Sequence, residues 1–257
     1  MNYLNAFVVP ALAGSERAHD VERYLALFED GISKEVPPFF QAGYGISFRS
    51  HVENPYWVIQ SLISNAIKEG EGSRDLASVA DSCESQDLTS DLAIHIGDEA
   101  RHCRMYLQLI DTVFPVALTD DLRQTLLQKF PSVTYEKTSL NVPLQTPWKM
   151  LDYLIQINLG EVRTRIHQKL LEPVLQAYCP EENKESLCRT LCKLAGDECC
   201  HIKYTASRIG ALSREFSEVA VRDLFLRRFC EFNRYTDKEL GRQRDGLFST
   251  APLLRDR

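Results

Sequence analysis

A hexapeptide rich in metal-ligating residue types occurs twice in the chain. Residues 97–102 read GDEARH and residues 196–201 read GDECCH. Residues three apart share one face of a helix, so in each copy the glutamate and the histidine can reach the same point. One such pair is typical of a solvated helix face. Two copies about a hundred residues apart, each preceded by Gly-Asp, indicate two halves of a metal site inside a helical bundle.

Each hexapeptide is preceded by a segment that predicts a long helix with an acidic residue on its apolar face. The first begins at Asn54-Pro55 and the second at Thr146-Pro147, where Asn or Thr suits the N-cap and proline the first turn. When the prolines are aligned, the apolar stripes coincide, and Glu69 and Glu161 each lie fourteen residues after the proline. Glu71 is the alternative to Glu69, because Gly70-Glu71 repeats Gly160-Glu161. We prefer Glu69, because the other register would break the match of the stripes.

The chain therefore repeats one pattern, a helix with a buried glutamate followed by a helix with the hexapeptide. We predict a single all-α domain over residues 1–257, whose core bundle covers about 55–210, with flanking helices at 15–33 and 218–234. Thr119 to Phe130 predicts a short capped helix between the halves. Gly43 and Gly45 predict an irregular stretch after Pro37-Pro38, and residues 241–257 a tail. No strand pattern of any length is present.

The ligand types indicate which metal the site would hold. Four glutamates neutralise two divalent cations, and carboxylate with imidazole suits iron or manganese, whereas structural zinc sites favour thiolates. A glutamate from each of two helices and Glu-x-x-His from each of two others is the ligand set of carboxylate-bridged dinuclear bundles.

On these residues the sequence resembles the ferritin-like di-iron carboxylate superfamily, in particular its oxygen-activating members such as bacterial multicomponent monooxygenases and ribonucleotide reductase small subunits. The resemblance implies a ferritin-like four-helix bundle with additional N- and C-terminal helices. It also implies two iron ions, or manganese or a mixed Mn/Fe pair. The residues that it implies as ligands are Glu69, Glu99, His102, Glu161, Glu198 and His201.

Five further residues could act beside the ligands. Asp98 and Asp197 lie one turn before the histidines and could accept the second imidazole N–H. His95 lies four residues before Glu99 and could be an additional ligand, although a core or supporting histidine is the better interpretation. Tyr106 occupies the place of a radical-forming tyrosine in ribonucleotide reductases, but an ordinary core aromatic is favoured. Thr164 could reach the metal pocket or bond the helix backbone.

Composition limits the class of protein. A net charge of −6 and a pI near 5.6 disfavour nucleic-acid binding. No apolar run approaches the roughly 18 residues of a membrane span. The eight cysteines are scattered through helical segments, which is typical of reduced thiols and predicts a cytoplasmic protein.

We therefore predict a non-haem di-iron oxidase or oxygenase that uses dioxygen to oxidise a small organic substrate. Hydroxylation, N-oxygenation, desaturation and C–C cleavage stay open, as does a homodimer. No G-x-G-x-x-G fingerprint is visible, so an external electron donor such as a reductase or ferredoxin is expected. The alternative is a ferroxidase or iron-binding ferritin-like protein.

Overall fold

The described part of the protein is built from α-helices. The computed structural model describes residues 8–13, 18–135 and 145–244, and within these ranges it contains nine α-helices, three short 3₁₀ turns and no β-strand. The all-α prediction is confirmed for this part of the chain. The helices are α1 (Val9–Leu12), α2 (Ala18–Lys34), α3 (Ala42–Val52), α4 (Pro55–Asp81), α5 (Gln86–Val113), α6 (Asp120–Lys129), α7 (Pro147–Tyr178), α8 (Lys184–Leu212) and α9 (Glu218–Arg244).

The structure confirms the predicted starts of α4, α6 and α7. Asn54 caps α4 by accepting a hydrogen bond from the Tyr56 amide at 3.0 Å, with Pro55 in the first turn. Thr119 caps α6 in the same manner, accepting from Leu122 N. α7 begins at Pro147, and Thr146 Oγ1 accepts from Lys149 N at 3.4 Å. These side chains satisfy amides that the first turn of a helix leaves without intrahelical partners.

Four long helices of 27 to 32 residues, α4, α5, α7 and α8, carry the predicted apolar stripes. The apolar residues that coincide when the two prolines are aligned are all buried: Val58, Ile59, Leu62 and Ile63 on α4, and Met150, Leu151, Leu154 and Ile155 on α7. Such stripes make helices pack together, which suggests a bundle. None of the described helices combines the length and the apolar character that crossing a bilayer requires.

The chain divides into two compact units, each built from segments distant in sequence. The first comprises residues 1–48, 145–169 and 195–245, and the second 49–144, 170–194 and 246–257. α7 and α8 each contribute residues to both units. The organisation as a single domain stays a prediction.

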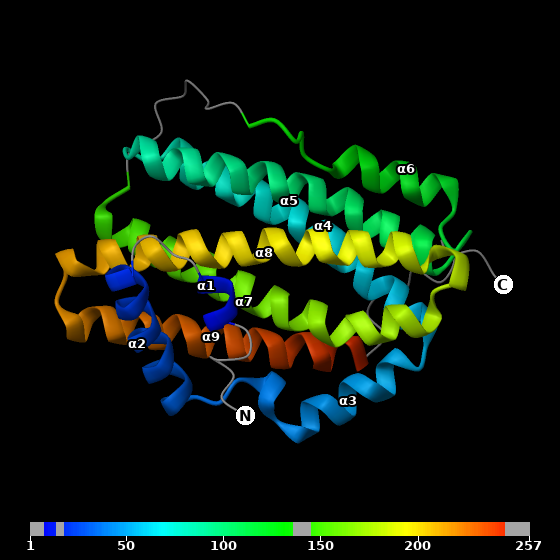
Figure 1. Ribbon diagram of the computed structural model, residues 1–257, viewed down its shortest axis with the longest axis horizontal. Coiled ribbons are helices and arrows are strands. Elements are labelled where there is room, and N and C mark those ends of the chain that lie inside the picture. Colours follow the sequence, from blue (N-terminus) through cyan, green and yellow to red (C-terminus); the bar gives the residue numbers. More distant parts are fainter. Residues whose placement is uncertain (1–7, 14–17, 136–144, 245–257) are drawn as a thin grey trace. The chain divides into compact units, whose positions relative to one another are not determined.

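In the second unit, α4 and α5 lie side by side (Figure 1). The connection between them is short, since α4 ends at Asp81 and α5 begins at Gln86 under a Ser85 cap. A connection of this length makes the two helices antiparallel neighbours. Ser73 Oγ donates to Ile96 O at 3.1 Å, which ties the helices midway along their length.

In the first unit, α2 packs along α9 (Figure 1). Tyr24 and Phe28 of α2 meet Phe225 and Phe229 of α9, with Phe28 and Phe229 edge to face at 5.9 Å between ring centroids. Aromatic pairs in this geometry stabilise the fold by more than the burial of their apolar area alone provides. The predicted flanking helices at 15–33 and 218–234 are therefore observed as α2 and a longer α9, while residues 15–17 lie outside the described ranges.

In the first unit α8 approaches α2 closely at Gly210. A Cβ built on Gly210 would lie 1.9 Å from the Asp20 carbonyl oxygen, so only glycine fits there. The Arg214 guanidinium pairs with Asp20 at 2.5 Å, and Arg23 Nε donates to Ser213 Oγ at 2.7 Å. Ser213 and Arg214 lie in the 3₁₀ turn that directly follows α8, so these bonds hold the end of α8 against α2 close to Gly210.

One predicted loop is a helix. Gly43 and Gly45 predicted an irregular stretch, yet they lie inside α3. Neither glycine has an atom within 4 Å of the place where its Cβ would be, whereas Phe48, further along the helix, is buried. The packing of Phe48 outweighs the weak helix propensity of glycine.

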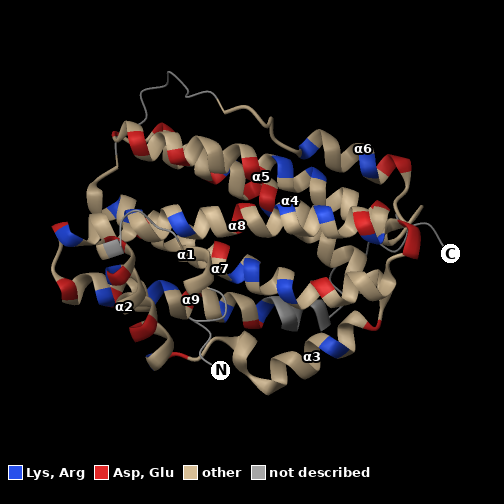
Figure 2. Cartoon of the chain, in the orientation of Figure 1, with Lys and Arg blue, Asp and Glu red and all other residues tan. Residues whose placement is uncertain are grey.

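Acidic and basic residues are interspersed along the helices of each unit (Figure 2). Many form pairs one turn apart, for example Lys34 with Asp30 at 2.7 Å and Arg222 with Glu218 at 2.7 Å. Exposed pairs of this kind contribute little to stability, and they leave local surface charges neutralised.

Candidate metal centre

The second unit brings together two predicted carboxylate ligands and one imidazole. Glu69 comes from α4, and Glu99 and His102 come from adjacent positions on one face of α5. One ligand atom from each of the three lies within 4.8 Å of the other two. His102 Nδ1 is 3.6 Å from Glu99 Oε1 and 3.9 Å from Glu69 Oε2.

These separations fit a shared cation better than direct hydrogen bonds. An N–H···O bond spans about 2.7–3.2 Å. Two ligand atoms at about 2.1 Å from one ion lie about 3 Å apart at a right angle and about 4.2 Å apart when opposite. Glu69, Glu99 and His102 are 8%, 5% and 0% exposed, so their charges and dipoles have little water to solvate them.

The buried glutamate of α4 is Glu69, as the proline alignment predicted. Glu71, the alternative, is exposed. The two side chains lie two residues apart on a helix, so they must point in different directions. Gly70 between them lies close to α5, because a Cβ at that position would be 3.3 Å from Cys103 Sγ.

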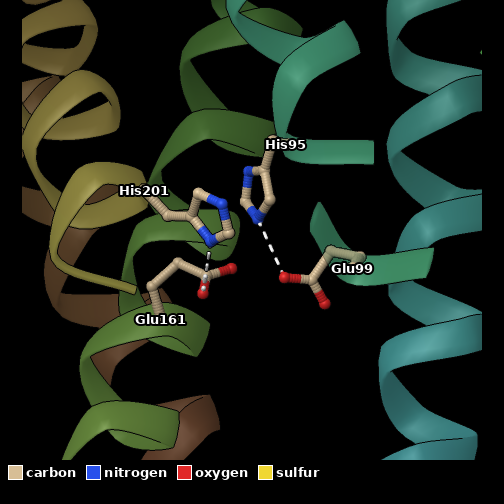
Figure 3. Close-up of side chains that lie close together, drawn as sticks. All are labelled: His95, Glu99, Glu161 and His201. Carbon is tan, nitrogen blue, oxygen red and sulfur yellow. Dashed lines mark ion pairs between the residues drawn. The ribbon is translucent and has the colours of Figure 1, made fainter. Parts of the chain in front are cut away.

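Glu99 is held as an anion. Burial by itself raises the pKa of a carboxyl group, but the neighbouring polar groups of Glu69, His102 and His95 outweigh this effect and hold the pKa of Glu99 well below its usual range. His95 contributes directly, with Nε2 at 3.3 Å from Glu99 Oε1 (Figure 3). The structure thus places His95, which is fully buried, against a predicted ligand.

The first unit holds the matching set from α7 and α8. His201 Nδ1 lies 3.6 Å from Glu161 Oε2 (Figure 3) and 3.7 Å from Glu198 Oε2. Glu198 and His201 are 0% and 2% exposed. Each unit therefore contains two carboxylates that converge on the Nδ1 of one histidine.

Gln168 is a functional candidate that the sequence did not reveal. Its Nε2 donates to Glu198 Oε1 at 3.0 Å in the interior. Gln168 lies seven residues after Glu161 and hence on the same face of α7, which is the signal that could have identified it. A donor of this kind fixes the orientation of a ligating carboxylate.

A second buried polar network lies one turn from Glu161. Tyr24 OH donates to Asn158 Oδ1 at 2.6 Å, and Asn158 Nδ2 donates to Thr205 Oγ1 at 2.9 Å. Thr205 Oγ1 in turn donates to the His201 carbonyl at 2.6 Å. The network joins α2, α7 and α8 and connects to the backbone of a predicted ligand.

The remaining predicted residues are placed as follows. Asp98 accepts from the Arg101 guanidinium at 2.6 Å. Asp197 and Tyr106 are buried, and Thr164 is half-buried. Their predicted roles beside the ligands stay predictions.

All eight cysteines are free, and Cys103, which follows His102 on α5, is a poor metal ligand. Burial, followed by the charge of Glu99, raises the pKa of the Cys103 thiol to about 12. Because the thiolate is the ligating form, Cys103 stays a neutral core residue at physiological pH. The convergent donors are therefore oxygen and nitrogen, a set that suits iron or manganese.

No protein-family model, no curated protein and no solved structure gives a significant match to this chain. The comparisons thus leave the resemblance to ferritin-like proteins as a prediction. What stands on the residues themselves is an all-helical protein with two buried clusters of glutamate and histidine that could bind metal ions.

Proposed function

We propose that the two clusters bind a pair of iron ions and that the protein is an oxidase or oxygenase acting on a small organic substrate with dioxygen. The observation that carries the proposal is the occurrence, once in each unit, of two carboxylates converging on one buried imidazole, all of the carboxylates being buried except the half-buried Glu161. Four carboxylates and two imidazoles would neutralise two divalent ions. Bound ferrous iron would supply the electrons for the reduction of dioxygen.

The residues of the chain would bind, orient and exclude water. Glu69, Glu99 and His102 would hold one ion, and Glu161, Glu198 and His201 the other. Gln168 would keep the Glu198 carboxylate oriented through its hydrogen bond. The fully or almost fully buried neighbours of the ligands, such as Ala100 and Ile202, would keep solvent away from the oxidising centre.

The partners and location follow from the same proposal. An external electron donor, a reductase or a ferredoxin, would return the ions to the ferrous state between turnovers. The free thiols fit a reducing compartment, and we propose a cytoplasmic location.

Anaerobic titration of the metal-free protein with ferrous iron tests the proposal. We expect two ions bound per chain. On exposure to oxygen, the Mössbauer spectrum should then show that both bound ions have become ferric. Failure to bind any transition metal, or ions that stay ferrous in oxygen, would contradict it.

The same preparation distinguishes the alternative function. A ferroxidase would oxidise many equivalents of added ferrous iron per chain and accumulate a ferric mineral. The proposed oxygenase would stop after two equivalents and consume more oxygen only with reductant and a substrate present.

A further inference from the structure

A second candidate site lies entirely within the first unit. An apolar pocket opens among α2, α7, α9 and the 3₁₀ turn at Pro38–Phe40, and it encloses about 500 Å³, its open mouth included. Its walls include Phe28, Phe40, Phe229 and Phe232. Sites for small molecules typically have this apolar character, with a few polar groups that fix the orientation of the ligand.

One buried amide lines this pocket without a partner for its donor. Asn233 is 8% exposed, and its Nδ2 makes no hydrogen bond to any described residue. Thr236, one turn further along α9, donates to the Phe232 carbonyl at 3.0 Å. Because a buried donor without an acceptor is unfavourable, an oxygen atom of a ligand would satisfy this amide.

The charge of the described lining residues favours an anion. Arg163 is the one charged side chain among them, and no aspartate or glutamate lines the pocket. A guanidinium beside low-dielectric walls attracts a carboxylate more strongly than it would in water, and it repels an amine.

The pocket and the metal ligand of α7 use different faces of that helix. Leu159, Val162, Arg163 and Ile166 line the pocket at spacings of three, four and seven residues, which is one helix face. Glu161 lies on a face far from this one, at about 100° per residue, and its carboxylate approaches His201 (Figure 3). A ligand in the pocket would therefore lie on the opposite side of α7 from the Glu161–His201 pair.

We propose that this pocket binds a small apolar carboxylate. The tail lies among the phenylalanines, and the carboxylate accepts a hydrogen bond from Asn233 Nδ2 in the field of Arg163. The inference goes beyond the proposed function and does not rest on it, because no pocket-lining residue is a predicted metal ligand.

Calorimetric titration of the full-length, metal-free protein with three probes of equal tail length tests the proposal. The probes are decanoate, decan-1-ol and decylamine, used below their critical micelle concentrations. We expect decanoate to bind at least tenfold more tightly than decylamine, with decanol between them. Equal affinity for all three, or no binding of decanoate, would overturn the proposal.

Three variants then locate the binding. Asn233→Leu should weaken decanoate binding about tenfold and leave decanol binding nearly unchanged, because leucine keeps the apolar volume and removes the donor. Arg163→Gln should also weaken decanoate binding, whereas Lys149→Gln, the same charge loss at an exposed position of α7, should not. If Asn233→Leu fails to fold, the Arg163 and Lys149 pair decides. Equal decanoate affinity in both of these variants would place the ligand elsewhere and contradict the proposal.

Discussion

Two glutamates on α4, two positions apart, differ in their environments and give the sharpest test of the ligand assignment. Glu69 is buried beside Glu99 and His102, whereas Glu71 is exposed. Glu69→Ala should therefore remove about one of the two expected ferrous ions, measured by metal analysis after dialysis. Glu71→Ala, the matched control, should leave the stoichiometry unchanged. If Glu71→Ala is the damaging change, the register of α4 is wrong.

The orientation of a ligand can be tested separately from its presence. Gln168→Leu removes the amide that donates to Glu198 and leaves all six predicted ligands in place. We expect the affinity for ferrous iron to fall about 10- to 100-fold, the usual effect of losing such a partner. Gln156→Leu serves as control, because the Gln156 amide bonds only within its own turn, to Asp152. Equal affinities of the two variants would show that Gln168 does not support the site.

At the scale of elements, the two glycines that begin the hexapeptides have different roles. A Cβ on Gly97 would lie 3.0 Å from the Val133 carbonyl oxygen, whereas nothing lies within 4 Å of one on Gly196. Gly196→Ala should raise the free energy of unfolding by up to about 1 kcal/mol through helix propensity. In Gly97→Ala the clash should cancel that gain or reverse it. Urea denaturation of the two variants measures the difference. An equal increase in the free energy of unfolding in both variants would contradict the prediction, because the segment at Val133 would then move aside without cost.

The network that joins α2 to α7 predicts a dependence on pH. Tyr24→Phe would leave the buried Asn158 Oδ1 without its donor, which should cost about 1–3 kcal/mol of unfolding free energy. Burial, only partly offset by the hydrogen bond to Asn158, raises the pKa of Tyr24 above its ordinary value of about 10. The phenol therefore stays protonated in the fold under conditions where it ionises in the unfolded chain.

The sign of the pH effect follows from this shift. A raised pKa in the folded state gives stability that is fully present below a pH of about 10 and is lost as the pH rises further. The stability advantage of the wild type over Tyr24→Phe should thus shrink between pH 9 and about 11 in denaturant titrations. Tyr153→Phe, at an exposed position of α7, is the matched control for the exchange of tyrosine for phenylalanine itself.

For the whole molecule, metal binding should appear as thermal stability. Ligands that bind only the folded state add about 2.7 kcal/mol at a hundred times the dissociation constant. For a chain of this length that corresponds to a rise in Tm of about 5–10 °C. Anaerobic ferrous iron or manganese should produce this rise, measured by calorimetry, and magnesium should produce less, because imidazole suits it poorly. No shift with either transition metal would argue against the buried clusters as metal sites.

Much of the helical framework could be predicted because its signals are local. Asn54-Pro55 and Thr146-Pro147 mark helix starts by their own chemistry, and the apolar stripes behind them are periodic. The burial of Glu69 rather than Glu71 was predicted by comparing the two repeats. The helix over residues 42–52 was missed because it depends on the packing of Phe48, which the local glycines do not reveal.

Gln168 and the apolar pocket could not be predicted for a different reason. Both depend on which side chains from distant segments meet, as when Asn233 of α9 and Phe28 of α2 line one cavity. Periodicity identifies the buried face of a helix but not the neighbour that covers it. The periodicity of the helix before Pro37 therefore does not reveal that Phe28 and Ile32 line a candidate binding site.

The approach of α8 to α2 at Gly210 has a consequence for recognising other proteins of this kind. A substituent as small as a methyl group would overlap the Asp20 backbone, so any chain that keeps this crossing must keep glycine at this position. In other sequences that carry both hexapeptides, a glycine nine residues after the second histidine therefore indicates that α2 and α8 cross in the same way. Another residue at this position would indicate that α2 packs differently there.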